Sequence, residues 1–316
     1  MKEIGGYFGL EKLKNNEYYP DLIAVNNARN ALLYILKARN IKKLYIPYFL
    51  CDSVSTLCEK NGFSYEYYYI SKDFYPIFDF KLNKDEYLYV VNYYGQISNS
   101  DIIKLQKKYK NVILDNVQAF FQKNVPGIDT IYSCRKFFGV PDGAYLATSS
   151  VLSDEISIDV SKDRMKHILG RFEGAAYEYY SDFRNSDEMF ENLELRSMSK
   201  LTHNLLGAID YSKAKRRREK NFMELHNKLG AFNKLQLKKP KGPYAYPFYC
   251  KNGMEVKKKL AEKKIYVATL WPNVLSMDDG IEKDYAENIL PLPCDQRYNK
   301  TDMQYLIEVL HECLKM

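Results

Sequence analysis

Short apolar runs alternate with amphipathic stretches through the first half of the chain. The runs are rich in β-branched and aromatic residues, and they predict strands at 22–25, 43–47, 64–70, 86–94, 111–115, 129–133 and 144–149. The stretches between them predict helices at 28–38, over a segment that ends at 61, over 98–109 and, as a short piece, over 116–121. This alternation predicts an α/β fold with a largely parallel sheet between helices, whose ligands bind at the carboxyl ends of the strands.

The pattern changes in the second half of the chain. From about Ser150 it becomes polar and helical, and it includes a long helix over 209–230. The last hundred or so residues predict a small α/β lobe that closes with an amphipathic helix over 301–315. We therefore expect a large domain at 1–212 and a small C-terminal α/β domain at 213–316.

Length and composition favour a water-soluble globular protein. The chain has 316 residues, of which 46% are hydrophobic, so it can bury a large core. It contains no run near the roughly 20 apolar residues of a membrane span, and its first residues lack the apolar core of a signal peptide. We therefore expect a cytoplasmic protein with no membrane partner.

Charge and metal-ligand spacing exclude two further classes of function. The net charge of +7 is modest, and the basic run at 213–220 lies on the predicted long helix, where a solvated face is a simpler explanation than a phosphate-binding patch. We therefore expect no nucleic-acid partner. The six cysteines lack CxxC spacing and the four histidines share no ligand spacing, so no metal site is expected.

Four residues in the 111–136 region suggest cofactor chemistry. Asp115 and Ser133 end predicted strands, Gln118 follows Asp115, and Lys136 comes three residues after Ser133. An aldehyde cofactor needs an amine to hold it as a Schiff base and a carboxylate to keep its pyridine nitrogen protonated. Lys136 and Asp115 are the candidates for these roles in a pyridoxal phosphate enzyme. An Arg-Lys pair is also a common surface feature, and an Asp after an apolar run is often a strand-ending cap.

Four elements occur together in the order found in one enzyme family. They are NNARNALLYIL at 26–36, VVNYYGQ at 90–96, LDNVQAF at 114–120 and SCRKFFGVPDGA at 133–144. Over nearly its whole length the chain resembles the DegT/DnrJ/EryC1/StrS sugar aminotransferases, which are pyridoxal phosphate enzymes of fold type I. The lysine is retained, whereas relatives that carry histidine in its place do deoxygenation chemistry.

The resemblance assigns roles to residues of the cofactor site. It implies that Lys136 anchors pyridoxal phosphate, that Asp115 pairs with the pyridine nitrogen and that Gln118 lies near the ring hydroxyl. It also implies that Ser133 and the start of the first helix bind the phosphate, where Ala28 and Arg29 replace the family's glycine and threonine.

Three residues are candidates for the ring-stacking position. Counting from Pro47 puts Cys51 at the position of the aromatic residue that stacks on the ring, with Tyr48 and Phe49 as alternatives. Asn92 is a further candidate for the cofactor cleft.

The resemblance also implies a reaction and an assembly. Gln96, Arg297 and Tyr298 are candidate substrate contacts, and the expected reaction moves an amino group, from glutamate, to a nucleotide-linked keto sugar in polysaccharide or amino-sugar biosynthesis. A homodimer with shared active sites is expected. Two alternatives stay open: a non-catalytic relative that binds partners or regulates, and a nucleotide-sugar enzyme without pyridoxal phosphate. The second is disfavoured because no GxGxxG motif follows the first strand.

Overall fold

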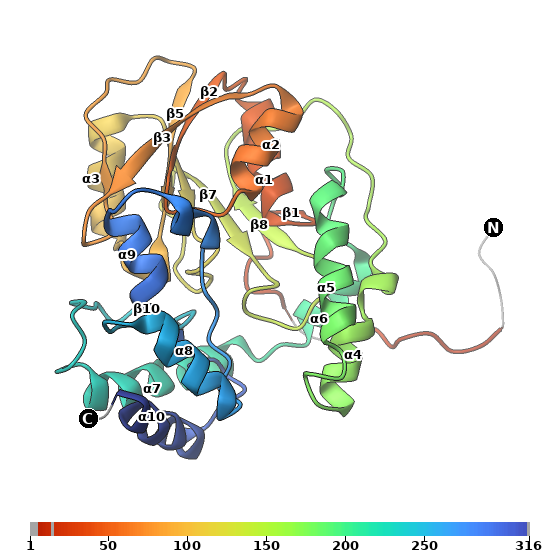
Figure 1. Ribbon diagram of the computed structural model, residues 1–316. Coiled ribbons are helices and arrows are strands. Elements are labelled where there is room, and N and C mark those ends of the chain that lie inside the picture. The colour runs from red at the N-terminus through yellow and green to blue at the C-terminus, as the bar shows by residue number, and fades with distance from the viewer. Residues whose placement is uncertain (1–5, 14–15, 315–316) are drawn as a thin grey trace.

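A single eight-stranded sheet forms the centre of the molecule in the computed structural model, which describes residues 6–13 and 16–314 (Figure 1). Its strands lie in the order β1-β8-β7-β6-β5-β2-β3-β4. Their bounds are β1 Ile23–Val25, β2 Lys43–Pro47, β3 Ser64–Ile70, β4 Pro76–Ile77, β5 Glu86–Val91, β6 Val112–Asp115, β7 Asp129–Ser133 and β8 Ala144–Ala147.

The middle of this sheet is parallel, as the sequence predicts. β3, β2, β5, β6 and β7 pair with one another in parallel, and β8 runs antiparallel to both β7 and β1. The carboxyl ends of β2, β5, β6 and β7 therefore lie along one edge of the sheet. The order reverses direction between β2 and β5, and this kind of switch point is where open α/β sheets bind ligands.

Helices cover both faces of the sheet. α1 (Ala28–Ala38) and α2 (Ser53–Asn61) contact each other, whereas α3 (Asn99–Tyr109) connects β5 to β6 in the opposite direction along the sheet. Right-handed crossovers then place α3 on the opposite face. The 3₁₀ turn η1 (Tyr93–Gly95) follows β5. These three helices agree with the sequence prediction within a few residues.

The short helix predicted over 116–121 is wrong. The Asp115 carboxylate accepts a hydrogen bond from the backbone N–H of Val117 at 2.8 Å, and the N–H of Asn116 donates to the Ile131 carbonyl at 2.8 Å. The Tyr19 hydroxyl donates to the Phe120 carbonyl at 2.6 Å. These bonds use backbone groups that a helix would need, so the segment forms turns.

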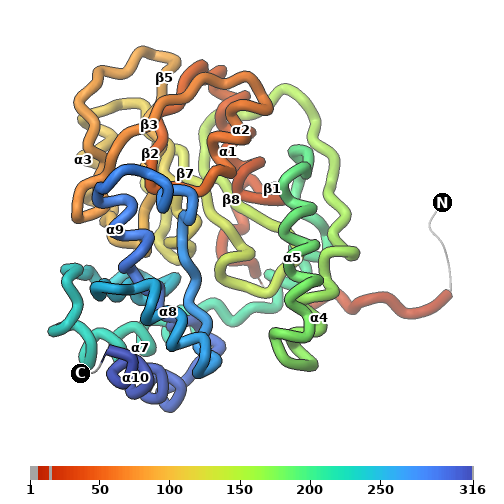
Figure 2. Tube along the Cα trace, viewed as in Figure 1, coloured from red at the N-terminus to blue at the C-terminus, as the bar shows by residue number. Residues whose placement is uncertain are grey.

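The second half of the chain is mostly helical. Its helices are α4 (Lys166–Glu173), α5 (Tyr180–Met189), α6 (Lys200–Gly207), α7 (Tyr211–Leu229), α8 (Gly253–Glu262), α9 (Ile281–Asn288) and α10 (Lys300–Leu314), with 3₁₀ turns η2 (Lys162–Arg164), η3 (Phe190–Asn192) and η4 (Pro272–Ser276). β9 (Tyr246–Tyr249) and β10 (Ile289–Leu292) form an antiparallel pair. Figure 2 shows α7, α8 and α10 gathered at one end of the molecule, away from the α4–α5 pair.

The C-terminal lobe has a core of its own. Phe222, Tyr246, Leu290 and Leu310 are among its buried members. However, the side chain of Trp271 packs against Phe49 of the large domain, with ring centres 4.3 Å apart. The domain boundary at 212 therefore stays a prediction. Within the described residues, no helix is long and apolar enough to cross a membrane.

Candidate active site

The amine of Lys136 and the carboxylate of Asp115 face the same edge of the main sheet. Asp115 ends β6, and the loop that carries Lys136 follows the end of β7. Because β6 and β7 are parallel neighbours, these positions meet at one edge. Burial raises the pKa of the Asp115 carboxyl, and the nearby positive charge of Lys136 opposes that rise. The exposed Lys136 amine forms no ion pair with any described residue, and it lies 5.7 Å from the centre of the Tyr244 ring.

The Asp115 carboxylate is fixed in orientation. The side chain is 3% exposed. The Tyr89 hydroxyl donates to one carboxylate oxygen at 2.8 Å, and the Val117 N–H donates to the other at 2.8 Å. Two donors and exclusion of water prepare this group to pair with a cation that enters the site, since such a pair is stronger where water is excluded.

Gln118 and Ser133 each present a free polar group near this pair. The side-chain oxygen of Gln118 accepts a hydrogen bond from the Tyr94 N–H at 2.8 Å. Its amide nitrogen has no hydrogen-bond partner within 6–13 and 16–314, and the Ser133 hydroxyl likewise has none there. Both groups are therefore available to a bound molecule.

Three guanidinium groups lie around Phe190, close to the start of α1. Arg29 donates to the Phe190 carbonyl at 3.1 Å, and the guanidinium carbons of Arg135 and Arg164 lie 3.7 and 5.4 Å from the ring centre. Burial lowers the pKa of Arg135, the charges of Arg29 and Arg164 lower it further, and Asp187 opposes them. Arg135 pairs with Asp187 at 3.1 Å and Arg164 pairs with Asp159 at 2.6 Å, whereas Arg29 forms no ion pair with a described residue, so its positive charge is the one left for a ligand.

The first turn of α1 adds to that positive field. Ala28 begins the helix, and the Asn27 side chain caps it by accepting from the Asn30 N–H at 2.8 Å. The first turn contains no acidic residue. A helix N-terminus beside Arg29 favours an anion, as the sequence predicts for this segment.

A cavity of about 630 Å³ opens between α1, α2 and the segment after α5, and Arg29 and Cys51 line it. Among the three alternatives for the ring-stacking residue, Phe49 is buried against Trp271, and Tyr48 stacks on Tyr67 with ring centres 4.6 Å apart. Cys51 is exposed and faces the cavity. Its ring-stacking role stays a prediction, and a thiol there would cover far less of a ring than an aromatic side chain would.

Asn92 and Gln96 are occupied in holding loops together. The Asn92 amide nitrogen donates to the side chains of Asn116 and Gln122 at 2.9 and 3.0 Å. Gln96 accepts from the Lys238 N–H at 2.8 Å and donates to its carbonyl at 3.1 Å. Their contact with ligands stays a prediction, because these bonds use most of their polar groups on the protein itself.

Arg297 and Tyr298 lie beside the lysine loop, in a second cavity of about 370 Å³ that Phe138 and Gly139 also line. The Arg297 guanidinium forms two hydrogen bonds of 2.8 Å with the Asp295 carboxylate. The structure thus brings these two predicted substrate residues to the segment that carries Lys136. This cavity shares no lining residue with the cavity that Arg29 and Cys51 line.

Sequence reasoning missed two tyrosines of the site. Tyr89 orients Asp115 from the neighbouring strand β5, and the ring of Tyr244 lies beside the Lys136 amine. The alternation along β5 gives only a weak signal for Tyr89. Tyr244 comes from a loop far along the chain, so no local pattern could have found it.

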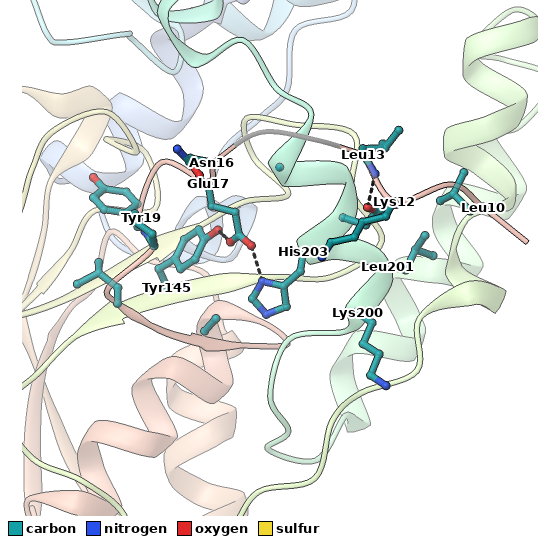
Figure 3. A pocket seen from close by; sticks show the side chains of 15 residues that line it. Leu10, Lys12, Leu13, Asn16, Glu17, Tyr19, Tyr145, Lys200, Leu201 and His203 are labelled. Atoms are coloured by element: carbon teal, nitrogen blue, oxygen red, sulfur yellow. Dashed lines mark hydrogen bonds and ion pairs between the residues drawn. The ribbon is translucent and has the colours of Figure 1, made fainter. Parts of the chain in front are cut away.

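A third cavity lies away from these residues. It has a volume of about 780 Å³ and is bounded by the segment before β1 and by α6 (Figure 3). Within it, Glu17 bonds His203 at 2.6 Å on one carboxylate oxygen and accepts from the Tyr145 hydroxyl on the other. The residues that line this cavity include none of the predicted site residues.

Several solved structures resemble this one over most of its length. An aminotransferase of the DegT/DnrJ/EryC1/StrS group from Brucella abortus matches with a TM-score of 0.61 and 14% identity, over 92% of this chain and 85% of that one. NtdA from Bacillus subtilis, solved with bound cofactor PMP, matches with a TM-score of 0.65 and 14% identity, over 93% and 73%. The sugar aminotransferase CalS13 from Micromonospora echinospora matches with a TM-score of 0.61 and 14% identity, over 93% and 87%. The chain has the DegT/DnrJ/EryC1/StrS aminotransferase fold.

This aminotransferase fold confirms the fold expected from the sequence motifs. No protein-family model matches the sequence, and no curated protein sequence is significantly similar to it. The similarity to known proteins is therefore detected by comparing structures and not by comparing sequences.

Proposed function

We propose that the protein is a pyridoxal phosphate-dependent aminotransferase that passes an amino group, with glutamate as donor, to a keto sugar carried on a nucleotide. The observation that carries the proposal is a lysine amine, without an ion pair among the described residues, on the loop after β7 and close to a buried, oriented carboxylate at the end of its parallel neighbour β6. Matched structures are described as sugar aminotransferases, and one was solved with PMP.

The residues at the sheet edge fit this cofactor. Lys136 is the amine that would hold its aldehyde, and Asp115 is the carboxylate that would face its pyridine nitrogen. The amide nitrogen of Gln118, which has no partner among the residues that the structure describes, would be available to the ring hydroxyl. Ser133 and Arg29, with the N-terminus of α1, offer donors and positive charge to the phosphate.

When bound, the cofactor acts as an electron sink that stabilises a carbanion at the amino-acid Cα. The protein supplies charge and proton transfer. Asp115, held by Tyr89 and Val117, would keep the ring nitrogen protonated. Burial raises the pKa of the Asp115 carboxyl, and a protonated ring nitrogen beside it would lower that pKa again, so the ion pair would stabilise both charged groups. The Lys136 amine is exposed on the same side, and once released it would carry a proton between Cα and the cofactor carbon.

The same proposal includes a homodimer. The α4–α5 pair protrudes from the body of the molecule, and Phe172 and Tyr177 are 91% and 77% exposed on it (Figure 1). Large apolar side chains gathered on one protruding element favour a buried interface.

A single-turnover assay tests the function directly. Holoprotein mixed with excess glutamate should release one equivalent of 2-oxoglutarate per active site, and Lys136→Ala should release none on that timescale. Lys107→Ala, the same change at an exposed position on α3 outside the cofactor site, serves as the matched control. Cofactor binding without release of the oxo acid in the unmodified protein would instead support a non-catalytic relative.

A further inference from the structure

The cavity that Arg297 and Tyr298 line combines three walls from distant parts of the chain. Phe138 and Gly139 of the lysine loop form one wall, the first turns of α7 form the second, and residues 296–299 form the third. Lys213 and Arg217 contribute from α7, so three cationic side chains meet in a space of about 370 Å³.

The negative charges near the cavity are already engaged. The Asp210 carboxylate caps α7 by accepting from the Lys213 N–H at 2.8 Å. Asp295 is held by Arg297, and although burial acts to raise its pKa, the hydrogen bonds and charge of Arg297 leave that pKa below its usual value. Lys213 and Arg217 form no ion pair with any residue in 6–13 or 16–314. Three cationic side chains of the cavity therefore face the two carboxylates of Asp210 and Asp295, so positive charge exceeds negative charge there.

Buried hydrogen bonds fix the shape of this cavity. The basic run at 213–220 was expected to be a solvated face, which is wrong for Arg218, since that side chain is 2% exposed. Arg218 donates to the carbonyls of Phe137 and Pro243 at 3.1 and 2.9 Å and to the Gln296 side chain at 2.6 Å. Gln296 in turn donates to the Phe137 carbonyl at 2.7 Å. The carbonyl that follows Lys136 is therefore locked to two walls of the cavity.

We propose that this cavity binds the diphosphate group of the amino-acceptor substrate, with Lys213, Arg217 and Arg297 as its ligands. The inference rests on the proposed function and deepens it. Lys213 and Arg217 have no counterion among the described residues, and Arg297, which Asp295 orients, adds a third cationic group. Together they match a multiply charged phosphoryl anion. A space of about 370 Å³ lies at the small end of ligand pockets. It suits the diphosphate, while the sugar extends along the lysine loop toward Lys136.

The test measures binding of inorganic pyrophosphate to the holoprotein by titration calorimetry, with the cofactor occupying its own phosphate site. Lys213→Gln with Arg217→Gln should weaken pyrophosphate binding roughly 10- to 100-fold, since each lost bond to a charged group weakens binding substantially. The matched control is Arg216→Gln with Lys220→Gln, which removes the same charge from the same helix outside the cavity. It should change the dissociation constant less than about twofold.

Several outcomes would overturn the proposal. Equal losses in the two double variants would show only a general effect of net charge. If the Lys213→Gln, Arg217→Gln variant lost affinity for glutarate but not for pyrophosphate, the cavity would be assigned to the dicarboxylate amino donor instead. Thermal melting of each variant checks that it is folded. If the protein holds no cofactor at Lys136 but still binds pyrophosphate through these residues, the aminotransferase proposal fails and the anion site stands.

Discussion

At the residue scale, the central feature is the Asp115 carboxylate, which Tyr89 and Val117 hold in position without a ligand. The sequence placed Asp115 at a strand end and Lys136 after the next strand, and the parallel pairing of β6 and β7 brings them together. The pattern of apolar runs could predict this, because strand ends in a parallel sheet share one edge. It could not predict Tyr89 and Tyr244, whose roles depend on strand order and on a loop from the distant C-terminal half.

Replacing Asp115 with Asn separates charge from shape. The amide oxygen can still accept from Tyr89 or Val117, so the protein should fold and bind cofactor. Loss of the negative charge opposite the ring nitrogen should slow single-turnover amino transfer roughly 100-fold or more. Stopped-flow absorbance of the glutamate half-reaction measures the effect. A rate within a few-fold of the unmodified protein would remove Asp115 from its proposed role.

Arg29 replaces the threonine of the related motif and lies in the guanidinium cluster around Phe190. Changing Arg29 to Gln should weaken pyridoxal phosphate binding about tenfold, because one charge-assisted contact to the phosphate is lost. Pyridoxal, which has no phosphate, should bind both proteins equally. Arg216→Gln on the outer side of α7 is the control. Equal weakening for both ligands would contradict a phosphate contact.

At the element scale, the strands of the main sheet other than β4, and the helices α1 to α3, followed from their apolar periodicity, whereas 116–121 did not. There, the side chains of Asp115 and Tyr19 take backbone groups that a helix would use. Local sequence gave no sign of Tyr19, which lies far away along the chain. Likewise, the basic run on α7 predicted its helix correctly but not the burial of Arg218, which depends on partners from two other segments.

The segment before β1 is tied to α6 by the Glu17–His203 pair (Figure 3). The hydrogen bond to Glu17 raises the pKa of His203, while burial opposes the rise. Stabilisation by this pair is therefore complete below the unfolded histidine pKa of about 6.5 and is lost as pH rises through the higher folded value. Because His203 is partly exposed, the contribution should be at most about 1 kcal/mol.

Urea unfolding at acidic and alkaline pH checks this expectation. His203→Gln should be less stable than the unmodified protein at about pH 5.5, and the two should converge at about pH 9. A difference of the same size at both pH values would show that packing, and not charge, joins the two segments.

At the scale of the whole molecule, the chain shares its fold with solved aminotransferases to which its sequence is only 14% identical. The βα alternation and the order of four motifs were enough to predict that architecture. The arrangement of the C-terminal lobe was harder to predict from the sequence. Trp271 comes from a segment between elements of the lobe, yet it packs into the core of the large domain against Phe49. Such packing depends on contacts between distant parts of the chain.

The protruding α4–α5 pair leads to a prediction about assembly. Light scattering after gel filtration should give twice the 37.1 kDa chain mass. Replacing Phe172 and Tyr177 with Glu should shift the protein toward the monomer, because two charges would be buried in an apolar interface. Phe232→Glu, at an exposed position of the C-terminal lobe, is the control. A protein that is monomeric at all concentrations yet fully active would contradict the dimer.

The most direct test of the account is to reduce the protein with borohydride in the presence of pyridoxal phosphate and to map the labelled peptide. We expect a single adduct on Lys136, which disappears in Lys136→Arg. Lys257 is a natural competitor within the chain, because burial lowers the pKa of its amine to about 8. Labelling of Lys257 in place of Lys136, or the absence of any adduct, would contradict the proposed active site.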